Sequence, residues 1–168
     1  MRRLALAIFA AAAVVQAAAP TMAVANDWRT YRNERYGTTI DYPDIFKAGP
    51  PPANDDGLAF KSDDGAAFSV FASFNALDLD LAGFKDFIVK NLEAGEVVTY
   101  QAQGKDWFVI SGTKGADAIF YQRHLLSHGK QMTEGFVMSY PARLKPKYDP
   151  IVARMSKSFR SGSGFQTQ

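Results

Sequence analysis

Hydrophobic and polar residues alternate along most of the chain between residues 28 and 140, a spacing typical of strands. The alternation is clearest where Phe68, Val70, Ala72 and Phe74 fall on one face of an extended segment. Glycine and aspartate interrupt the pattern at short intervals, as turns require. We expect strands over residues 28–33, 38–42, 58–62, 66–75, 97–102, 107–112, 116–126 and 130–140.

Two segments change to hydrophobic spacings of three and four residues, which predicts amphipathic helices. The first covers residues 80–94, with Asp80 as its N-cap and Gly95 as the residue that ends it. The second covers residues 148–159, and we expect it to begin near Pro150. Each helix has an apolar stripe that must pack against another surface.

The order of these elements predicts an α+β domain in which helices flank an antiparallel β-sheet. Short turns at Gly104, Lys114–Gly115 and His128–Gly129 connect the last four strands, so we expect an antiparallel meander. Asp63-Asp64-Gly65 predicts an earlier hairpin, because Asp-Gly tolerates the positive φ of a tight turn. Residues 47–56 contain three consecutive prolines and are expected to form an irregular loop.

Two motifs rich in aromatic residues stand near the ends of the predicted domain. They are Tyr31-x-Asn33-x-x-Tyr36-Gly37-x-x-Ile40-x-Tyr42-Pro43 and the stretch from Tyr148 to Met155-x-x-Ser158-Phe159. Together they resemble the PsbP-like fold, an α/β/α sandwich found in PsbP subunits of the photosynthetic oxygen-evolving complex and in DcrB-like exported proteins. The resemblance covers most of residues 28–160 and implies an accessory or binding role without catalysis.

The first 25 residues have the parts of a secretory signal peptide. Arg2 and Arg3 precede an apolar run at residues 4–15, and Ala23-Val24-Ala25 supplies a cleavage site. A membrane anchor is the alternative, but the apolar run is shorter than the roughly 20 residues that span a bilayer. We therefore expect a periplasmic or secreted protein with no transmembrane segment after cleavage. The expected division is a signal peptide at residues 1–25, a single PsbP-like domain at 26–160 and a flexible tail at 161–168.

Composition narrows the class of protein further. The sequence has no cysteine, so we expect neither a disulfide nor the lipid anchor of a bacterial lipoprotein. Two of the 19 Lys and Arg residues, and none of the 17 Asp and Glu residues, precede residue 26, so the mature chain has 17 side chains of each sign. A neutral chain lacks the basic surface that binds nucleic acid, and we expect no nucleic-acid partner.

Histidine and aspartate residues are the candidate metal ligands. His124 and His128 lie four residues apart where a predicted strand reaches the turn at Gly129. An extended chain separates them by about 13 Å, so ordinary surface or rim positions are favoured. The pairs Asp55–Asp56 and Asp63–Asp64 lie at opposite ends of another predicted strand. Turns explain these carboxylates, and calcium binding stays open as the alternative. We expect no metal and no cofactor.

Catalysis has little support in the sequence. It contains no cysteine, no G-x-S-x-G motif and no glycine-rich phosphate loop after a predicted strand. We therefore expect a protein that is not an enzyme.

Aromatic residues make up 13% of the sequence, and alternation places some of them on the face opposite the main apolar one, including Phe71 and also Tyr121 with Arg123. They form a second core layer if helices cover both faces of the sheet, and a binding patch if one face is partly open. The loop at residues 47–57 is another candidate contact surface, because prolines reduce the entropy lost on binding; a rigid connector is the alternative. The candidate binding residues are Pro51, Asn54, Asp55, Asp56, Phe71, Tyr121 and Arg123.

These observations favour an exported, non-catalytic accessory domain that contacts a protein partner or assembly in the bacterial envelope. One alternative is a carrier of a small ligand or lipid that uses a pocket between sheet and helix. A less favoured alternative is a metal-dependent hydrolase, which requires the histidines or aspartates to converge.

Overall fold

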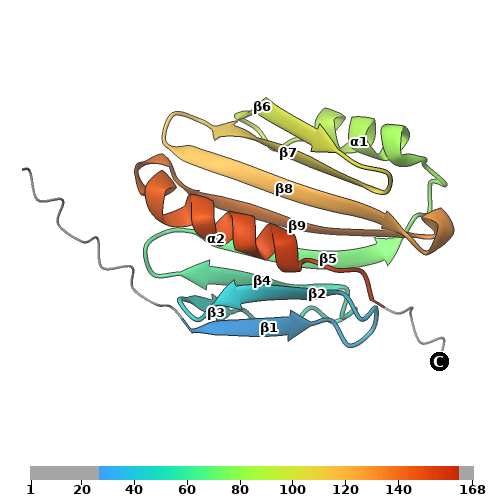
Figure 1. Ribbon diagram of the computed structural model, residues 1–168, viewed down its shortest axis with the longest axis horizontal. Coiled ribbons are helices and arrows are strands. Elements are labelled where there is room, and N and C mark those ends of the chain that lie inside the picture. Colours follow the sequence, from blue (N-terminus) through green and yellow to red (C-terminus); the bar gives the residue numbers. More distant parts are fainter. Residues whose placement is uncertain (1–26, 163–168) are drawn as a thin grey trace, which may run out of the picture.

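The computed structural model of the protein describes residues 27–162, which form nine strands and two α-helices (Figure 1). Within this range neither helix is long and apolar enough to cross a bilayer. The elements are β1 (Trp28–Arg32), β2 (Thr39–Pro43), β3 (Phe46–Ala48), β4 (Gly57–Ser62), β5 (Ala67–Phe74), α1 (Leu81–Lys90), β6 (Glu96–Gln103), β7 (Trp107–Lys114), β8 (Ala118–Ser127), β9 (Met132–Pro141) and α2 (Lys145–Ser158).

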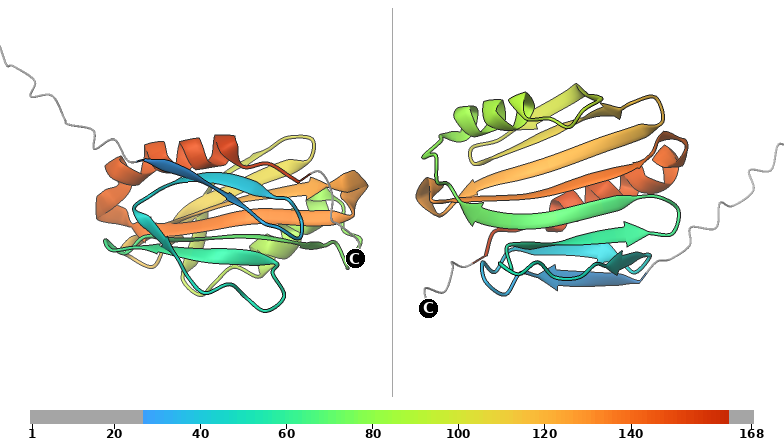
Figure 2. Two further views of the ribbon diagram at one scale, coloured as in Figure 1. Left: turned by 90° about the horizontal axis from the view of Figure 1, so that it is seen from below. Right: turned by 180° about the vertical axis from the view of Figure 1, so that it is seen from behind.

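Seven strands form one antiparallel sheet in the order β3-β4-β5-β9-β8-β7-β6. Strands β1 and β2 form a separate ribbon that packs beside α2. Helix α2 lies on one face of the large sheet and α1 on the other, as Figure 2 shows. The α+β class predicted from the sequence is therefore confirmed, and so is the meander from β6 to β9.

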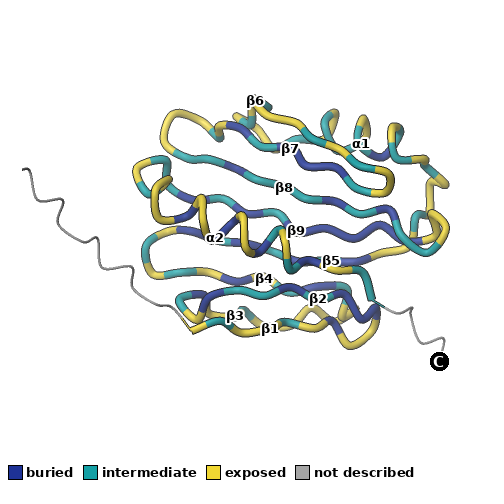
Figure 3. Tube along the Cα trace, in the orientation of Figure 1, coloured by how far each residue is buried: buried dark blue, intermediate teal, exposed yellow. Residues whose placement is uncertain are grey.

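Two hydrophobic cores hold the helices to opposite faces of the sheet. Figure 3 shows in dark blue the buried stretches of the chain. The larger core lies beneath α2 and β2 and includes the parallel stack of Phe60 and Phe68, with ring centroids 4.4 Å apart. The smaller core lies beneath α1, where the Phe84 ring contacts the Phe108 ring at 5.3 Å. Because strand residues alternate between faces, β8 contributes to both cores, with Phe120 in the smaller one and with Ile119 and Tyr121 packed against the larger one.

Three differences from the prediction go beyond one or two residues at the end of an element. Residues 46–48 form β3, which pairs with β4 where an irregular loop was expected to begin. Helix α1 ends at Lys90, because the N–H of Asn91 already donates to the Phe87 and Ile88 carbonyls that close the helix. Helix α2 begins at Lys145, so Pro150 lies inside it rather than at its start. Pro146, near the first turn, occupies the position that proline favours.

The two residues that the structure describes after Arg160, Ser161 and Gly162, pack against a buried carboxylate and its surroundings. Glu134 is 1% exposed and accepts hydrogen bonds from the Ser161 hydroxyl at 2.5 Å and the Thr38 hydroxyl at 2.6 Å. A Cβ on Gly162 would lie 2.0 Å from the Tyr36 carbonyl oxygen, which shows how closely this segment packs. Residues 163–168, and the predicted signal peptide, lie outside the described residues.

Asp64, in the turn between β4 and β5, ties this turn to α2. Its carboxylate accepts hydrogen bonds from Lys147 and Tyr148 at 2.6 Å each, and from Ser62 at 2.6 Å. Partial burial alone would raise the pKa of Asp64, but these three donors hold the pKa well below its usual range. The turn predicted from Asp63-Asp64-Gly65 therefore also anchors the last helix.

Replacing Asp64 with asparagine is expected to lower the unfolding free energy by about 1.5–3 kcal/mol at pH 7, the range for hydrogen bonds to a charged group. The folded pKa is depressed, so Asp64 stabilises the protein above its unfolded pKa of about 3.9. This contribution is lost as pH falls below about 4, and the difference between wild type and Asp64→Asn should shrink in urea titrations there. In the control Asp63→Asn, which removes an exposed ion pair to Lys47, the loss should stay below about 1 kcal/mol. Equal losses in the two variants would contradict the anchoring role.

Candidate functional site

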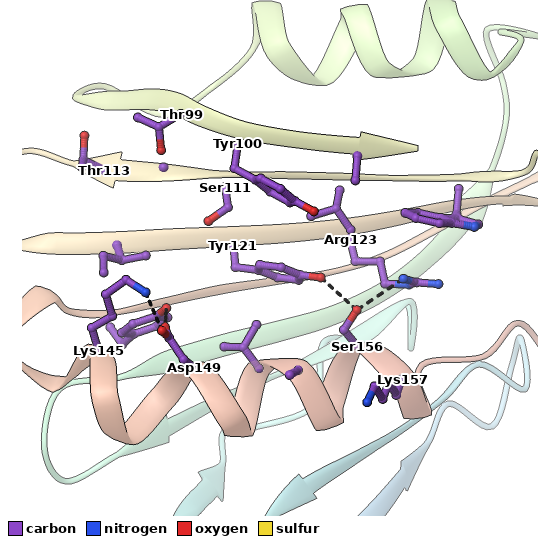
Figure 4. A pocket seen from close by; sticks show the side chains of 18 residues that line it. Thr99, Tyr100, Ser111, Thr113, Tyr121, Arg123, Lys145, Asp149, Ser156 and Lys157 are labelled. Atoms are coloured by element: carbon purple, nitrogen blue, oxygen red, sulfur yellow. Dashed lines mark hydrogen bonds and ion pairs between the residues drawn. The ribbon is translucent and has the colours of Figure 1, made fainter. Parts of the chain in front are cut away.

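A groove of about 640 Å³ runs along α2, on the sheet face that this helix covers only in part (Figure 4). Strands β7 and β8 form its floor, α2 forms one wall and β6 forms the opposite rim. The polar and aromatic side chains that line it include Thr99, Tyr100, Trp107, Ser111, Thr113, Tyr121, Arg123, Tyr140, Lys145, Asp149, Ser156 and Lys157.

Strand register places the floor residues side by side. Ser111 on β7 pairs with Tyr121 on β8, and Val109 pairs with Arg123. Their chain neighbours point to the opposite face, where Phe120 is among the side chains beneath α1. The alternation that builds the α1 core therefore also presents Tyr121 and Arg123 to the groove.

Ser156 on α2 joins the helix wall to the floor. Its Oγ accepts hydrogen bonds from the Tyr121 hydroxyl at 2.8 Å and from Nη1 of Arg123 at 3.3 Å (Figure 4). The Tyr121 ring stacks on Phe136 at 5.6 Å, and the Arg123 guanidinium lies over the Trp107 ring at 4.7 Å. These contacts hold Tyr121 and Arg123 in one orientation before any ligand binds.

Burial changes the acid–base properties of both floor residues. It raises the pKa of Tyr121, more than the hydrogen bond with Ser156 and the charge of Arg123 lower it. Burial lowers the pKa of Arg123, although a guanidinium stays protonated at physiological pH. A protonated phenol and a cation do not remove the hydroxyl proton of Ser156. This arrangement is suited to binding, and it does not activate Ser156 as a nucleophile.

The other end of the groove holds the acidic lining residue, Asp149. Its carboxylate pairs with Lys145 one helical turn earlier and accepts a hydrogen bond from the Tyr140 hydroxyl at 3.2 Å. Burial, together with the neighbouring Asp149 carboxylate, raises the pKa of Tyr140. The negative charge at this end is therefore already balanced.

The loop residues predicted to bind a partner lie at the opposite edge of the sheet, between β3 and β4. The side chain of Asn33 donates to the Asp55 carbonyl at 2.9 Å, and Arg35 donates to the Asn54 carbonyl at 2.7 Å. The Asn54 amide also donates to the Asp56 carboxylate at 2.6 Å. Pro51 is exposed. This loop contacts the turn between β1 and β2, and the structure does not bring it to the groove.

Phe71 lies on the other face of the sheet from Tyr121 and Arg123, so these three residues do not form one patch. It is half-buried, and its ring centroid is 6.0 Å from that of His124. The expectation that they share a face fails because β5 pairs with β9, which places Phe71 opposite Gly135. The sequence does not show which face of β5 aligns with which face of β8.

The expectation of surface or rim positions for both histidines is wrong for His124. This residue is 1% exposed and stacks on Phe108 at 4.8 Å, and burial lowers its pKa to about 3. His128 is hydrogen-bonded with Ser161 at 3.3 Å. Between residues 27 and 162, no three His, Asp or Glu side chains come close enough to hold a metal ion.

The candidate residues from the sequence include Tyr121 and Arg123 on the groove floor and no residue of its walls. Tyr100 on the β6 rim and Ser156 and Lys157 on α2 were not among the candidate residues. A signal for the helix wall exists, because Asp149, Ala153 and Ser156 recur at spacings of four and three residues beside the buried stripe. The predicted helix at residues 148–159 rests on the buried stripe alone.

Comparisons with known proteins define the fold class. The cyanobacterial PsbP of Synechocystis sp. PCC 6803 matches with a TM-score of 0.60 and 13% identity, over 87% of this chain and 98% of that one. The Ran-binding protein Mog1p of Saccharomyces cerevisiae matches with a TM-score of 0.57 and 11% identity, over 81% and 96% of the two chains. No protein-family model and no curated protein sequence matches. The protein therefore has a PsbP-like fold, as its sequence motifs indicated.

Proposed function

We propose that the protein is an exported, non-catalytic binding domain that contacts a protein partner in the bacterial envelope through the groove beside α2. The observation that carries this proposal is the groove itself, with Tyr121 and Arg123 held in place by Ser156 but left uncovered on the groove side. Aromatic residues and arginine are enriched in protein interfaces. The protein partner named for yeast Mog1p, whose fold is similar, lends further support.

Export rests on the predicted signal peptide at residues 1–25, which makes the periplasm or the exterior of the cell the proposed location. The loop with Pro51 and residues 54–56 is proposed as a second contact surface. Its backbone is already fixed by Asn33 and Arg35, so little conformational entropy would be lost on binding. Phe71 lies neither in the groove nor in the loop with Pro51. It is proposed only as a separate contact on the face of the sheet opposite to the groove.

Filling the groove tests this proposal. Ala153 is an exposed groove-lining residue on α2, so Ala153→Trp should obstruct the groove without disturbing the core. In cells treated with a crosslinker, we expect the tagged wild-type protein to recover a stoichiometric partner, and Ala153→Trp to recover at least about tenfold less. The matched control is Ala59→Trp. Ala59 is exposed on β4, on the face of the sheet opposite to the groove. Equal recovery by all three proteins would contradict the proposal.

A carrier of a small ligand is the second candidate function, because a volume of about 640 Å³ lies within the roughly 300–1,000 Å³ of small-molecule sites. A carrier should retain its ligand through purification. Native mass spectrometry of the mature protein would then show an added mass that is absent from Ala153→Trp. A spectrum with only the mass of the polypeptide would count against a carrier.

A further inference from the structure

Positive charge is unbalanced at the Arg123 end of the groove. In the part of the chain that the structure describes, neither Arg123 nor Lys157 forms an ion pair. The acidic lining residue, Asp149, lies near the other end and is paired with Lys145. An anion in the groove would therefore meet two cations without an ion-pair partner at one end, where the more distant Asp106 carboxylate is the acidic group that acts on Arg123.

Arg123 also has a donor without an acceptor. Its Nε is buried and has no hydrogen-bond partner among residues 27–162, while stacking on Trp107 and the bond to Ser156 fix the guanidinium plane. Because Nε is shielded from the groove, a ligand would meet the Nη groups of the guanidinium instead. A carboxylate satisfies guanidinium donors best, because it can accept two parallel hydrogen bonds from them.

The shape of the groove favours an extended chain over a compact molecule. The wall runs from Lys145 to Lys157, which are twelve residues apart, or about 18 Å along a helix. That length holds roughly five residues of extended polypeptide at about 3.3 Å each. The opposite rim is open, since Tyr100 is 57% exposed, whereas pockets for small molecules enclose most of their ligand.

We infer that the groove binds an extended segment of a protein partner and that an acidic side chain of this segment pairs with Arg123. The inference rests on the proposed function and adds the chemistry of the partner. Apolar and aromatic side chains of the segment would pack on Trp107 and Tyr100, which line the same groove. Lys157 would contribute long-range attraction at the rim.

Two capped pentapeptides, Tyr-Leu-Asp-Leu-Tyr and Tyr-Leu-Asn-Leu-Tyr, test this inference when they are titrated into the mature protein and followed by NMR. We expect the acidic peptide to bind at least about tenfold more tightly than its amide analogue, with shift changes at groove residues. Raising the salt concentration should weaken only the acidic peptide. Arg123→Gln should abolish the preference, whereas the control Lys61→Gln, which removes an exposed charge from the opposite face, should keep it.

The variants separate the claim that the groove binds a partner from the claim that the bound segment is acidic. If both peptides bind equally and Ala153→Trp blocks both, the groove is a binding surface but the acidic partner is wrong. If neither peptide binds, or if octanoate binds the groove more tightly than the acidic peptide, the inference is overturned. Because Arg123→Gln could perturb folding, Lys157→Gln gives an independent test at an exposed position, where we expect a loss of about threefold for the acidic peptide alone.

Discussion

Phe136→Ala is expected to lower the free energy of unfolding by about 3–5 kcal/mol, the largest effect of any substitution considered for this protein. Phe136 is fully buried on β9, where its ring contacts Phe159 at 5.3 Å and Tyr121 at 5.6 Å. Alanine would remove these contacts and leave a cavity beneath α2. Because Tyr121 rests on Phe136, the groove floor should lose its fixed geometry as well. Chemical denaturation at 25 °C measures the loss directly.

Val137→Ala provides the control for Phe136→Ala. Val137 is the next residue on β9, points to the opposite face and is only half-buried. We expect it to cost less than about 1.5 kcal/mol. A loss below 1 kcal/mol for Phe136→Ala, or equal losses in the two variants, would contradict the assignment of the core beneath α2.

Gly112→Ala is expected to detach the β6 rim and to cost about 3 kcal/mol. A Cβ at residue 112 would lie 1.9 Å from the Val97 carbonyl oxygen, too close for any atom to occupy. The clash is with backbone, so β6 itself must move. The register shift between Val98 and Tyr100 lies opposite this glycine, which is a common position for glycine in a strand. Amide hydrogen exchange should accelerate in β6 more than in β8 or β9.

The control for Gly112→Ala is Thr113→Ala, at the adjacent exposed position of β7. It should change the free energy of unfolding by no more than about 0.5 kcal/mol. If Gly112→Ala leaves β6 exchange and stability at wild-type values, then β6 does not pack against β7 as closely as described.

The features that were predicted correctly depend on short stretches of sequence. Asp80 caps α1, and its carboxylate accepts a hydrogen bond from the N–H of Gly83 at 2.8 Å, as the side chain and the start of the helical spacing indicate. The hairpin around Asp63-Asp64-Gly65 and the meander likewise follow from turn residues between alternating segments. Sequence separation is small in each of these cases, so local preferences decide the outcome.

The features that were missed depend on residues far apart in the chain. Strand β5 lies between β4 and β9, and only this long-range pairing decides that Phe71 and Tyr121 face opposite ways. His124 is buried because Phe84 of α1 and Phe108 of β7 pack against its ring. The groove was found only in part, because its floor comes from an alternating strand and its wall from a helix that packs across the sheet.

The most direct test of the binding role is site-specific photocrosslinking from the groove in intact cells. A photoreactive phenylalanine analogue would replace Tyr100, on the groove rim, or Phe87, on α1 at the opposite face; these side chains are 57% and 43% exposed. We expect a single protein to be crosslinked from position 100 and not from position 87, and the product to disappear in Ala153→Trp. Crosslinking from position 87 alone, or a product at position 100 that persists in Ala153→Trp, would contradict the groove as the binding surface.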